Sequence, residues 1–138
     1  MTTYLDASVV LRIALGDPQP LAEWSAIRIA VASSLVRVEC LRTIDRLRLR
    51  HALPDEVVAE RRAAVERLLA GAFAVGIDDV VLQRAALPLP TSLGTLDAVH
   101  LATAMLWRES SGPDIVMATH DEALARAARA CGLRAVGA

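Results

Sequence analysis

The sequence predicts an α/β fold, a three-layer sandwich in which a short parallel sheet carries helices on both faces. Short apolar segments alternate along the chain with longer segments of helical pattern, which is typical of parallel sheets covered on both sides. The chain has 138 residues, of which 54% are hydrophobic, and this is enough for a substantial core. No linker, internal repeat or low-complexity stretch divides it, so we expect a single domain spanning residues 1–138.

The predicted elements follow from the apolar segments and from the residues that begin or end helices. In chain order they are a strand at 2–5, helices at 8–15 and 20–27, a strand at 29–32, helices at 34–51 and 54–70, a strand at 73–75, helices at 79–86 and 96–108, a strand at 115–118, a helix at 121–131 and a strand at 133–136. Helix starts are assigned from the capping residues Ser33 or Ser34 and Thr95, and from Pro20 in a first turn. Glycine and proline mark the helix ends, as at Gly132. The two long consecutive helices are expected to form a protruding pair.

Composition narrows the chemistry. All fifteen basic residues are arginine and none is lysine, which excludes a P-loop lysine and a Schiff-base lysine. The net charge of −1 provides no global attraction to nucleic acid, so any such attraction must be local. Cys40 and Cys131 have no zinc-like spacing and are expected to be buried free thiols. No segment reaches transmembrane length, so we expect a cytoplasmic protein without a membrane partner.

Four carboxylates provide the main functional signal. Asp6 directly follows the first predicted strand, and Asp121 follows the fourth by two residues, so both fall where parallel sheets bind ligands. Glu39 and Asp97 lie on predicted helices that could lean over the same crevice. Converging like charges require either protons or a cation. Carboxylate oxygens favour Mg²⁺, with Mn²⁺ possible, and such a site suggests phosphodiester chemistry.

Taken singly, each acid also has a structural explanation. Asp97 and Asp121 stand at predicted helix starts, where a negative charge is favourable without any ligand. Glu39 could instead form a salt bridge with Arg37 or Arg42 on its own helix.

The segments around these acids resemble those of PIN-domain ribonucleases, and the size and element order resemble VapC toxins of type II toxin–antitoxin systems. The segments are Asp6-Ala7-Ser8, the spacing from Ser34 to Glu39, the run from Thr95 to Ala104, and Ala118-Thr119-His120-Asp121. The resemblance implies a PIN-like fold and Mg²⁺-dependent endonucleolytic cleavage of structured RNA by attack of a metal-activated water. It also implies an RNA substrate, a cognate VapB-like antitoxin and a homodimer.

The resemblance further implies a role for each matching position. Asp6 and Asp97 match the principal metal ligands, Glu39 the acid that completes the site, and Asp121 a fourth, more variable acid. Ser8 and Thr119 match hydroxyls that hydrogen-bond the acidic cluster. The alternative function is a PIN-like module that binds RNA or protein without cutting. A phosphatase or phosphorelay receiver is disfavoured by the absence of lysine.

Several residues remain open on sequence alone. His100 lies one helical turn after Asp97, and we expect it to pack or to support the site rather than to act as a base. His120 is expected at the surface or at an edge that contacts RNA, and not as a ligand. Arg42, Arg46 and Arg50 share one face of the long helix, which is either a solvated face or a stripe that contacts the RNA backbone.

Overall fold

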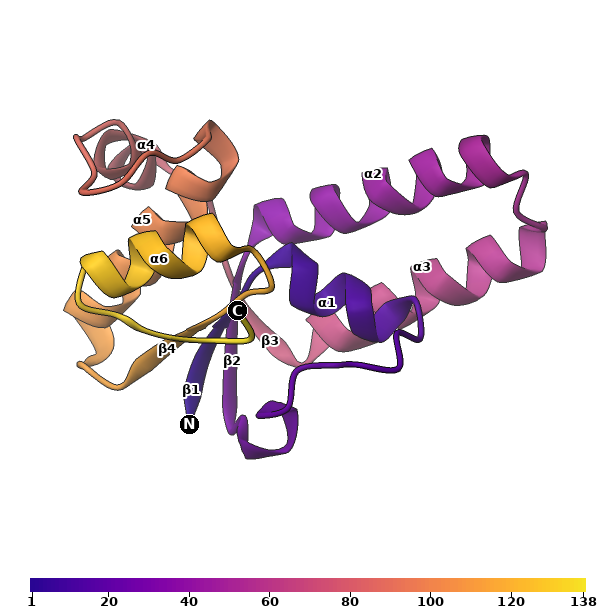
Figure 1. The fold of residues 1–138 in the computed structure, drawn as a ribbon, viewed down its shortest axis with the longest axis horizontal. Coiled ribbons are helices and arrows are strands. Elements are labelled where there is room, and N and C mark those ends of the chain that lie inside the picture. The colour runs from indigo at the N-terminus through magenta and orange to yellow at the C-terminus, as the bar shows by residue number, and fades with distance from the viewer.

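The computed structural model describes residues 1–138 as a five-stranded parallel sheet between two layers of helices, as the alternating pattern predicts (Figure 1). The strand order is β3-β2-β1-β4-β5. The elements are β1 (Thr2–Leu5), α1 (Ala7–Ala14), a 3₁₀ helix (Trp24–Ala26), β2 (Ile29–Ser33), α2 (Ser34–His51), α3 (Asp55–Ala70), β3 (Ala72–Val75), α4 (Asp79–Ala85), α5 (Thr95–Ser111), β4 (Ile115–Ala118), α6 (Glu122–Ala130) and β5 (Arg134–Val136).

Side chains alternate between the two faces of the central strands, and each face has its own core. Tyr4 lies in register with Val31 and Met117, and these three pack with α5 and α6. The next residue, Leu5, pairs with Ala118 and packs on the other face against α1, α2 and α3. This period of two follows from the pleat of the strands.

The parallel pairing aligns the carboxyl ends of the central strands. Leu5 and Ala118 are register partners at the ends of β1 and β4, so Asp6 and Thr119 leave the sheet side by side. Ser33 ends β2 and caps α2, its hydroxyl accepting a hydrogen bond from the Leu35 N–H at 3.1 Å. The segments that follow β1, β2 and β4 therefore meet at one edge of the sheet.

Helices α2 and α3 extend away from the sheet as an antiparallel pair (Figure 1). Ile44 and Val65 are completely buried in the core that this pair shares with α1. Val38 and Leu49 remain exposed on α2, and Val65 is the only fully buried residue of α3, so the pair keeps apolar side chains at its surface.

Three features of the predicted helices are wrong. The helix expected at 20–27 is reduced to the 3₁₀ turn Trp24–Ala26. Its backbone N–H groups bond to carbonyl oxygens three residues back rather than four, and by Arg28 the backbone already bonds to Met1 next to the sheet. Thr95 does not cap its helix: Gly94 is the capping residue, it provides no side-chain bond, and Thr95 is the first helical residue. That helix also continues to Ser111, three residues beyond the expected end.

The two cysteines and the apolar lengths of the helices were also predicted from the sequence. Both cysteines are free; Cys40 is buried, and burial raises the pKa of its thiol to about 12. Cys131 is only partly buried. None of the helices combines the length and apolar character required to cross a bilayer.

Candidate functional site

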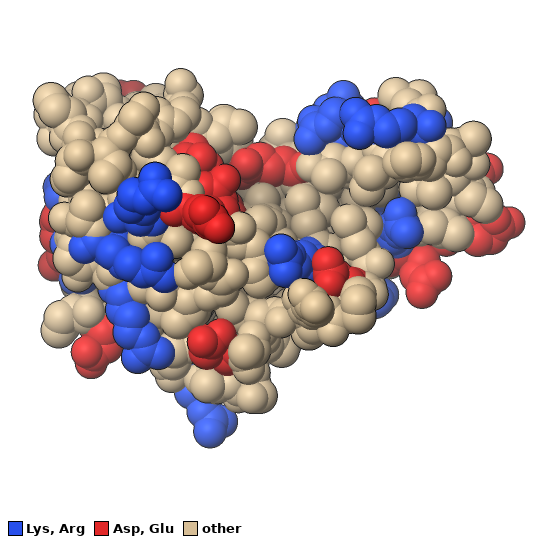
Figure 2. Space-filling model, viewed as in Figure 1, with Lys and Arg blue, Asp and Glu red and all other residues tan.

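All four predicted acids line one pocket of about 430 Å³. Asp6 comes from the end of β1, Glu39 from α2, Asp97 from the first turn of α5 and Asp121 from the cap of α6. Figure 2 shows acidic side chains gathered near the middle of the molecule, between its two groups of helices. Residues that are up to 115 positions apart in the sequence therefore converge where the strand ends predict a ligand site.

Asp6 is held by two hydroxyl groups. It is only 5% exposed, and its Oδ2 accepts hydrogen bonds from Ser8 Oγ at 2.6 Å and Thr119 Oγ1 at 2.8 Å. The same two hydroxyl oxygens accept the backbone N–H groups of His120 and Asp121, at 2.9 and 3.0 Å. Ser8 and Thr119 thus fix both the orientation of Asp6 and the loop that carries Asp121.

Glu39 is held by a buried histidine and not by an arginine. The Nε2–H of His100 donates to Glu39 Oε1 at 2.5 Å, and Nε2 also lies 3.8 Å from Asp6 Oδ1. The salt bridges considered from the sequence are absent, because Arg37 pairs with Glu66 and Arg42 pairs with Asp45. Glu39 therefore faces the acidic pocket rather than the solvent side of its helix.

His100 and Tyr4 form a buried pair beneath this pocket. Both side chains are completely buried, and Tyr4 Oη lies 2.8 Å from His100 Nδ1. Burial opposes the charged form of His100, but its hydrogen bond to Glu39 and the nearby carboxylates outweigh burial and raise its pKa. Burial also raises the pKa of Tyr4 far above its ordinary value, so the phenol stays protonated. Tyr4 is not among the predicted site residues, although a phenol in a buried strand requires a hydrogen-bond partner.

Asp97 and Asp121 differ in how the protein satisfies them. Asp121 Oδ1 accepts the Leu124 N–H at 2.8 Å and so caps α6, as one structural explanation expected. Asp97 accepts no hydrogen bond from the protein. Burial raises the pKa of Asp97, and the charges of Asp121, Asp6 and Glu39 raise it further, while His100 opposes them. The helix start alone does not explain Asp97, because this carboxylate is crowded by others and has no protein donor.

The donor chemistry of the pocket fits a hard divalent cation. No three His, Cys, Asp or Glu side chains already stand as a formed metal site. Mg²⁺ does not require such a cage, because it keeps several waters and uses one or two carboxylates together with substrate phosphates. The unsatisfied Asp97 and the second oxygens of Asp6 and Glu39 provide oxygen ligands of the required kind.

One face of α2 forms a wall of the pocket. Its lining residues recur at the spacing of a single helical face: Leu35, Val38, Glu39, Arg42, Thr43 and Arg46. Arg46 makes no ion pair and donates only to Thr43 Oγ1, at 2.9 Å. Basic side chains continue along α2 away from the acids (Figure 2). The pocket thus combines acids with cations at its rim.

The other residues left open from the sequence lie outside this arrangement. Nδ1 of His120 lies 2.8 Å from the Gly137 carbonyl oxygen, and His120 does not line the acidic pocket. Trp24 and Trp107 pack against the two cores. Neither tryptophan lines the pocket.

Comparison with known proteins agrees with this fold. The PIN domain family matches residues 3–130. The chain is 33% identical to Ribonuclease VapC46 of Mycobacterium tuberculosis over 137 residues, which cover 96% of this chain and 95% of the relative. The chain therefore belongs to the PIN-domain family and, within that family, to the VapC ribonucleases.

Solved structures provide an independent comparison of the fold. FitAcB from Neisseria gonorrhoeae superposes with a TM-score of 0.70 at 16% identity, covering 97% of this chain and 96% of that one. A toxin–antitoxin complex from Klebsiella pneumoniae gives a TM-score of 0.63 at 16% identity, with 91% and 89% covered. At these identities the likeness concerns the fold, which is the predicted PIN-like sandwich.

Proposed function

We propose that this chain is the endoribonuclease toxin of a toxin–antitoxin pair and cleaves structured RNA with the help of Mg²⁺, or alternatively Mn²⁺. The observation that supports the proposal most is the convergence of Asp6, Glu39, Asp97 and Asp121 on one pocket. The VapC relative is named as a ribonuclease, and the superposed Klebsiella pneumoniae structure is that of a toxin–antitoxin complex.

In the proposed mechanism each acid has a distinct task. Asp6 and Asp97 would be the principal ligands of the cation, with Glu39 completing the site and Asp121 assisting at its edge. A divalent cation bound there supplies charge stabilisation for the phosphodiester and a lowered pKa for attacking water. Ser8 and Thr119 keep Asp6 oriented by donating to its Oδ2, which leaves Oδ1 of Asp6 for the cation.

The RNA backbone is proposed to approach along α2. Arg46 lines the same pocket as the acids and makes no ion pair, so it can contact a phosphate without losing an acidic partner. Arg42 also lines the pocket, but it shares Asp45 with Arg48. A local cation is important in this chain because the net charge of −1 offers no general attraction to RNA.

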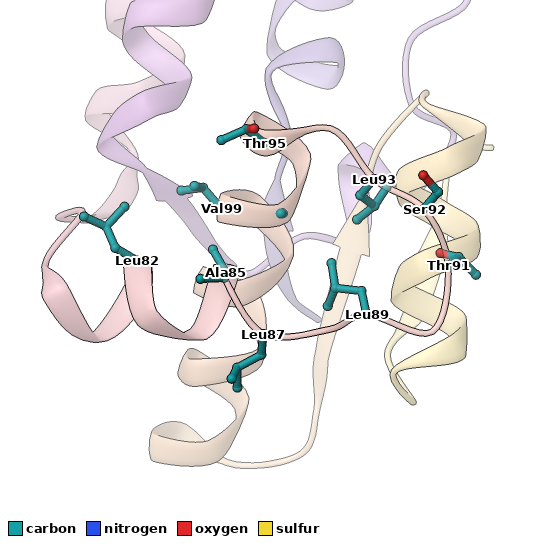
Figure 3. Close-up of a pocket in the computed structure, with 11 residues that line it drawn as sticks. Leu82, Ala85, Leu87, Leu89, Thr91, Ser92, Leu93, Thr95 and Val99 are labelled. Atoms are coloured by element: carbon teal, nitrogen blue, oxygen red, sulfur yellow. The ribbon is translucent and has the colours of Figure 1, made fainter.

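Protein partners are proposed at apolar surfaces. A groove of about 450 Å³ lies between α4, the start of α5 and the loop that joins them. Leu82, Leu89 and Val99 line this groove in Figure 3, and nearby Leu87 is 56% exposed. We propose this groove for self-association as a homodimer and the protruding α2–α3 pair for a VapB-like antitoxin.

The alternative is a PIN-like module that binds RNA or protein without cutting it. Such a module would have no use for the unsatisfied, crowded Asp97, which is why catalysis is preferred. The test compares cleavage of a folded RNA by wild type and Asp97→Asn in Mg²⁺ and in EDTA. Asp114→Asn is the matched control, because Asp114 is exposed and precedes β4 at the opposite edge of the sheet.

We expect cleavage by wild type and by Asp114→Asn in Mg²⁺, with none in EDTA. Asp97→Asn should lose at least about a hundredfold in rate, the scale of removing one group that stabilises transition-state charge. Undiminished cleavage by Asp97→Asn, or by wild type in EDTA, would reject the mechanism. RNA binding by wild type without any cleavage would favour the binding module.

A further inference from the structure

We propose that Tyr4 and His100 form a buried hydrogen-bonded pair that positions the Glu39 carboxylate for a divalent cation. The inference rests on the proposed function, since it concerns the same pocket. His100 and Tyr4 are positioning residues in this proposal and do not contact substrate. The pair connects three elements, because Tyr4 comes from β1, His100 from α5 and Glu39 from α2.

The hydrogen bonds assign the protons of the pair. Glu39 is an acceptor when ionised, so the proton between it and His100 lies on Nε2. In the neutral imidazole Nδ1 then accepts the Tyr4 hydroxyl proton over 2.8 Å, and in the charged ring Nδ1–H donates to the Tyr4 hydroxyl oxygen. In both forms the Tyr4 hydroxyl occupies Nδ1 and the Nε2–H donates toward Glu39, as outer partners orient metal-binding side chains.

This assignment leaves His100 without a free lone pair. One ring nitrogen is hydrogen-bonded to Tyr4, the other donates to Glu39, and the ring is completely buried. His100 can therefore neither ligate a cation nor take a proton from water in this arrangement. Its contribution acts through Glu39.

The same bonds select the carboxylate oxygens that face the pocket. His100 occupies Oε1 of Glu39, and the two hydroxyls occupy Oδ2 of Asp6. Oε2 of Glu39 and Oδ1 of Asp6 accept no hydrogen bond from the protein. Glu39 has a long side chain on a helix face, so without His100 it would be free to adopt rotamers that turn Oε2 away.

The proposal is tested by Mn²⁺ binding to the purified full chain, measured by isothermal titration calorimetry. His100→Leu removes both hydrogen bonds, whereas His100→Gln keeps an amide N–H near the place of Nε2. We expect His100→Leu to weaken Mn²⁺ binding about tenfold, at the lower end of effects reported for such supporting residues. His100→Gln should recover most of that loss, and Tyr4→Phe should give a smaller loss than His100→Leu.

A double-mutant cycle separates positioning from a general effect on stability. If His100 acts through Glu39, His100→Leu should cause no further loss of Mn²⁺ affinity in a Glu39→Gln background. Val65→Ala serves as the stability control, because Val65 is buried on α3 away from the pocket. It should lower the melting temperature without changing Mn²⁺ affinity.

Three results would overturn the inference. They are unchanged Mn²⁺ affinity in His100→Leu, additive losses with Glu39→Gln, and absence of Mn²⁺ binding by wild type. If wild type binds Mn²⁺ and follows the expected pattern but cuts no RNA, the positioning inference stands and the ribonuclease proposal fails.

Discussion

Replacing Asp97 by asparagine should stabilise the metal-free protein while abolishing most of its stabilisation by Mg²⁺. Burial and the neighbouring acids raise the pKa of Asp97 in the folded state. A raised carboxyl pKa means that the folded state favours the protonated form. The stability that protonated Asp97 adds to the folded state is fully present below the pKa of about 3.9 that it has in the unfolded chain. This stability is lost as pH rises through the pKa in the folded state. At neutral pH the ionised Asp97 therefore lowers the free energy of unfolding of the metal-free protein, and asparagine removes this destabilisation.

The expected shifts follow from chain length and binding linkage. For 138 residues, the entropy of unfolding is about 0.3 kcal/mol per kelvin, so 1 kcal/mol changes the melting temperature by about 3.5 °C. Because Asp97 is only partly buried and water screens its repulsion, asparagine should add no more than about 1 kcal/mol. Mg²⁺ at about one hundred times its Kd should stabilise wild type by about 2.7 kcal/mol, or about 9 °C.

Differential scanning calorimetry at pH 7 and pH 3.5, in EDTA and in Mg²⁺, measures these differences. In EDTA at pH 7, Asp97→Asn should melt up to about 3 °C above wild type, and the gap should close at pH 3.5. Mg²⁺ should raise the melting temperature of wild type far more than that of the variant. A variant that melts at or below wild type in EDTA and gains equally from Mg²⁺ would refute the crowding argument.

Three further outcomes follow from the same structure. Arg46→Gln should weaken RNA binding and lower the slope of log affinity against log salt concentration by about one unit. Arg28 is an exposed charge at the opposite edge of the sheet, so Arg28→Gln should leave this slope unchanged. Equal slopes in both variants would exclude a phosphate contact at Arg46. Thr119→Val should slow cleavage at least about tenfold, because Asp6 Oδ2 and the Asp121 N–H each lose a partner; a full rate at saturating Mg²⁺ would contradict this. Ile44 is completely buried, so Ile44→Ala should lower the free energy of unfolding by about 2–5 kcal/mol in urea melts. A loss below about 1 kcal/mol would mean that α2 is loosely packed.

Most of the fold could be predicted because its signals are local. Four-residue apolar strands and serine or aspartate caps carry their information within a few positions, and Asp6 and Asp121 could be assigned to strand ends on that basis. The segment at 20–27 was misassigned because its apolar spacing suggests a helix. The backbone there instead forms hydrogen bonds three residues back and then turns toward β2, which leaves only the short 3₁₀ turn at Trp24–Ala26.

The supporting contacts of the site could not be predicted from local patterns. The partner of Glu39 is 61 positions away, at His100, and the partner of His100 is 96 positions away, at Tyr4. Arginines near Glu39 in the sequence offered a simpler pairing, but those at 37 and 42 are used by Glu66 and Asp45. These groups come together only in the folded chain, where the His100 side chain of α5 bonds to both Tyr4 of β1 and Glu39 of α2.

The location of a bound cation tests the central claim most directly. Crystals grown with Mn²⁺ and measured near its absorption edge would mark the ion by anomalous scattering. We predict a peak in the acidic pocket within ligand distance of Asp6 and Asp97. Anomalous peaks confined to other parts of the surface, from protein that still cleaves RNA, would contradict it.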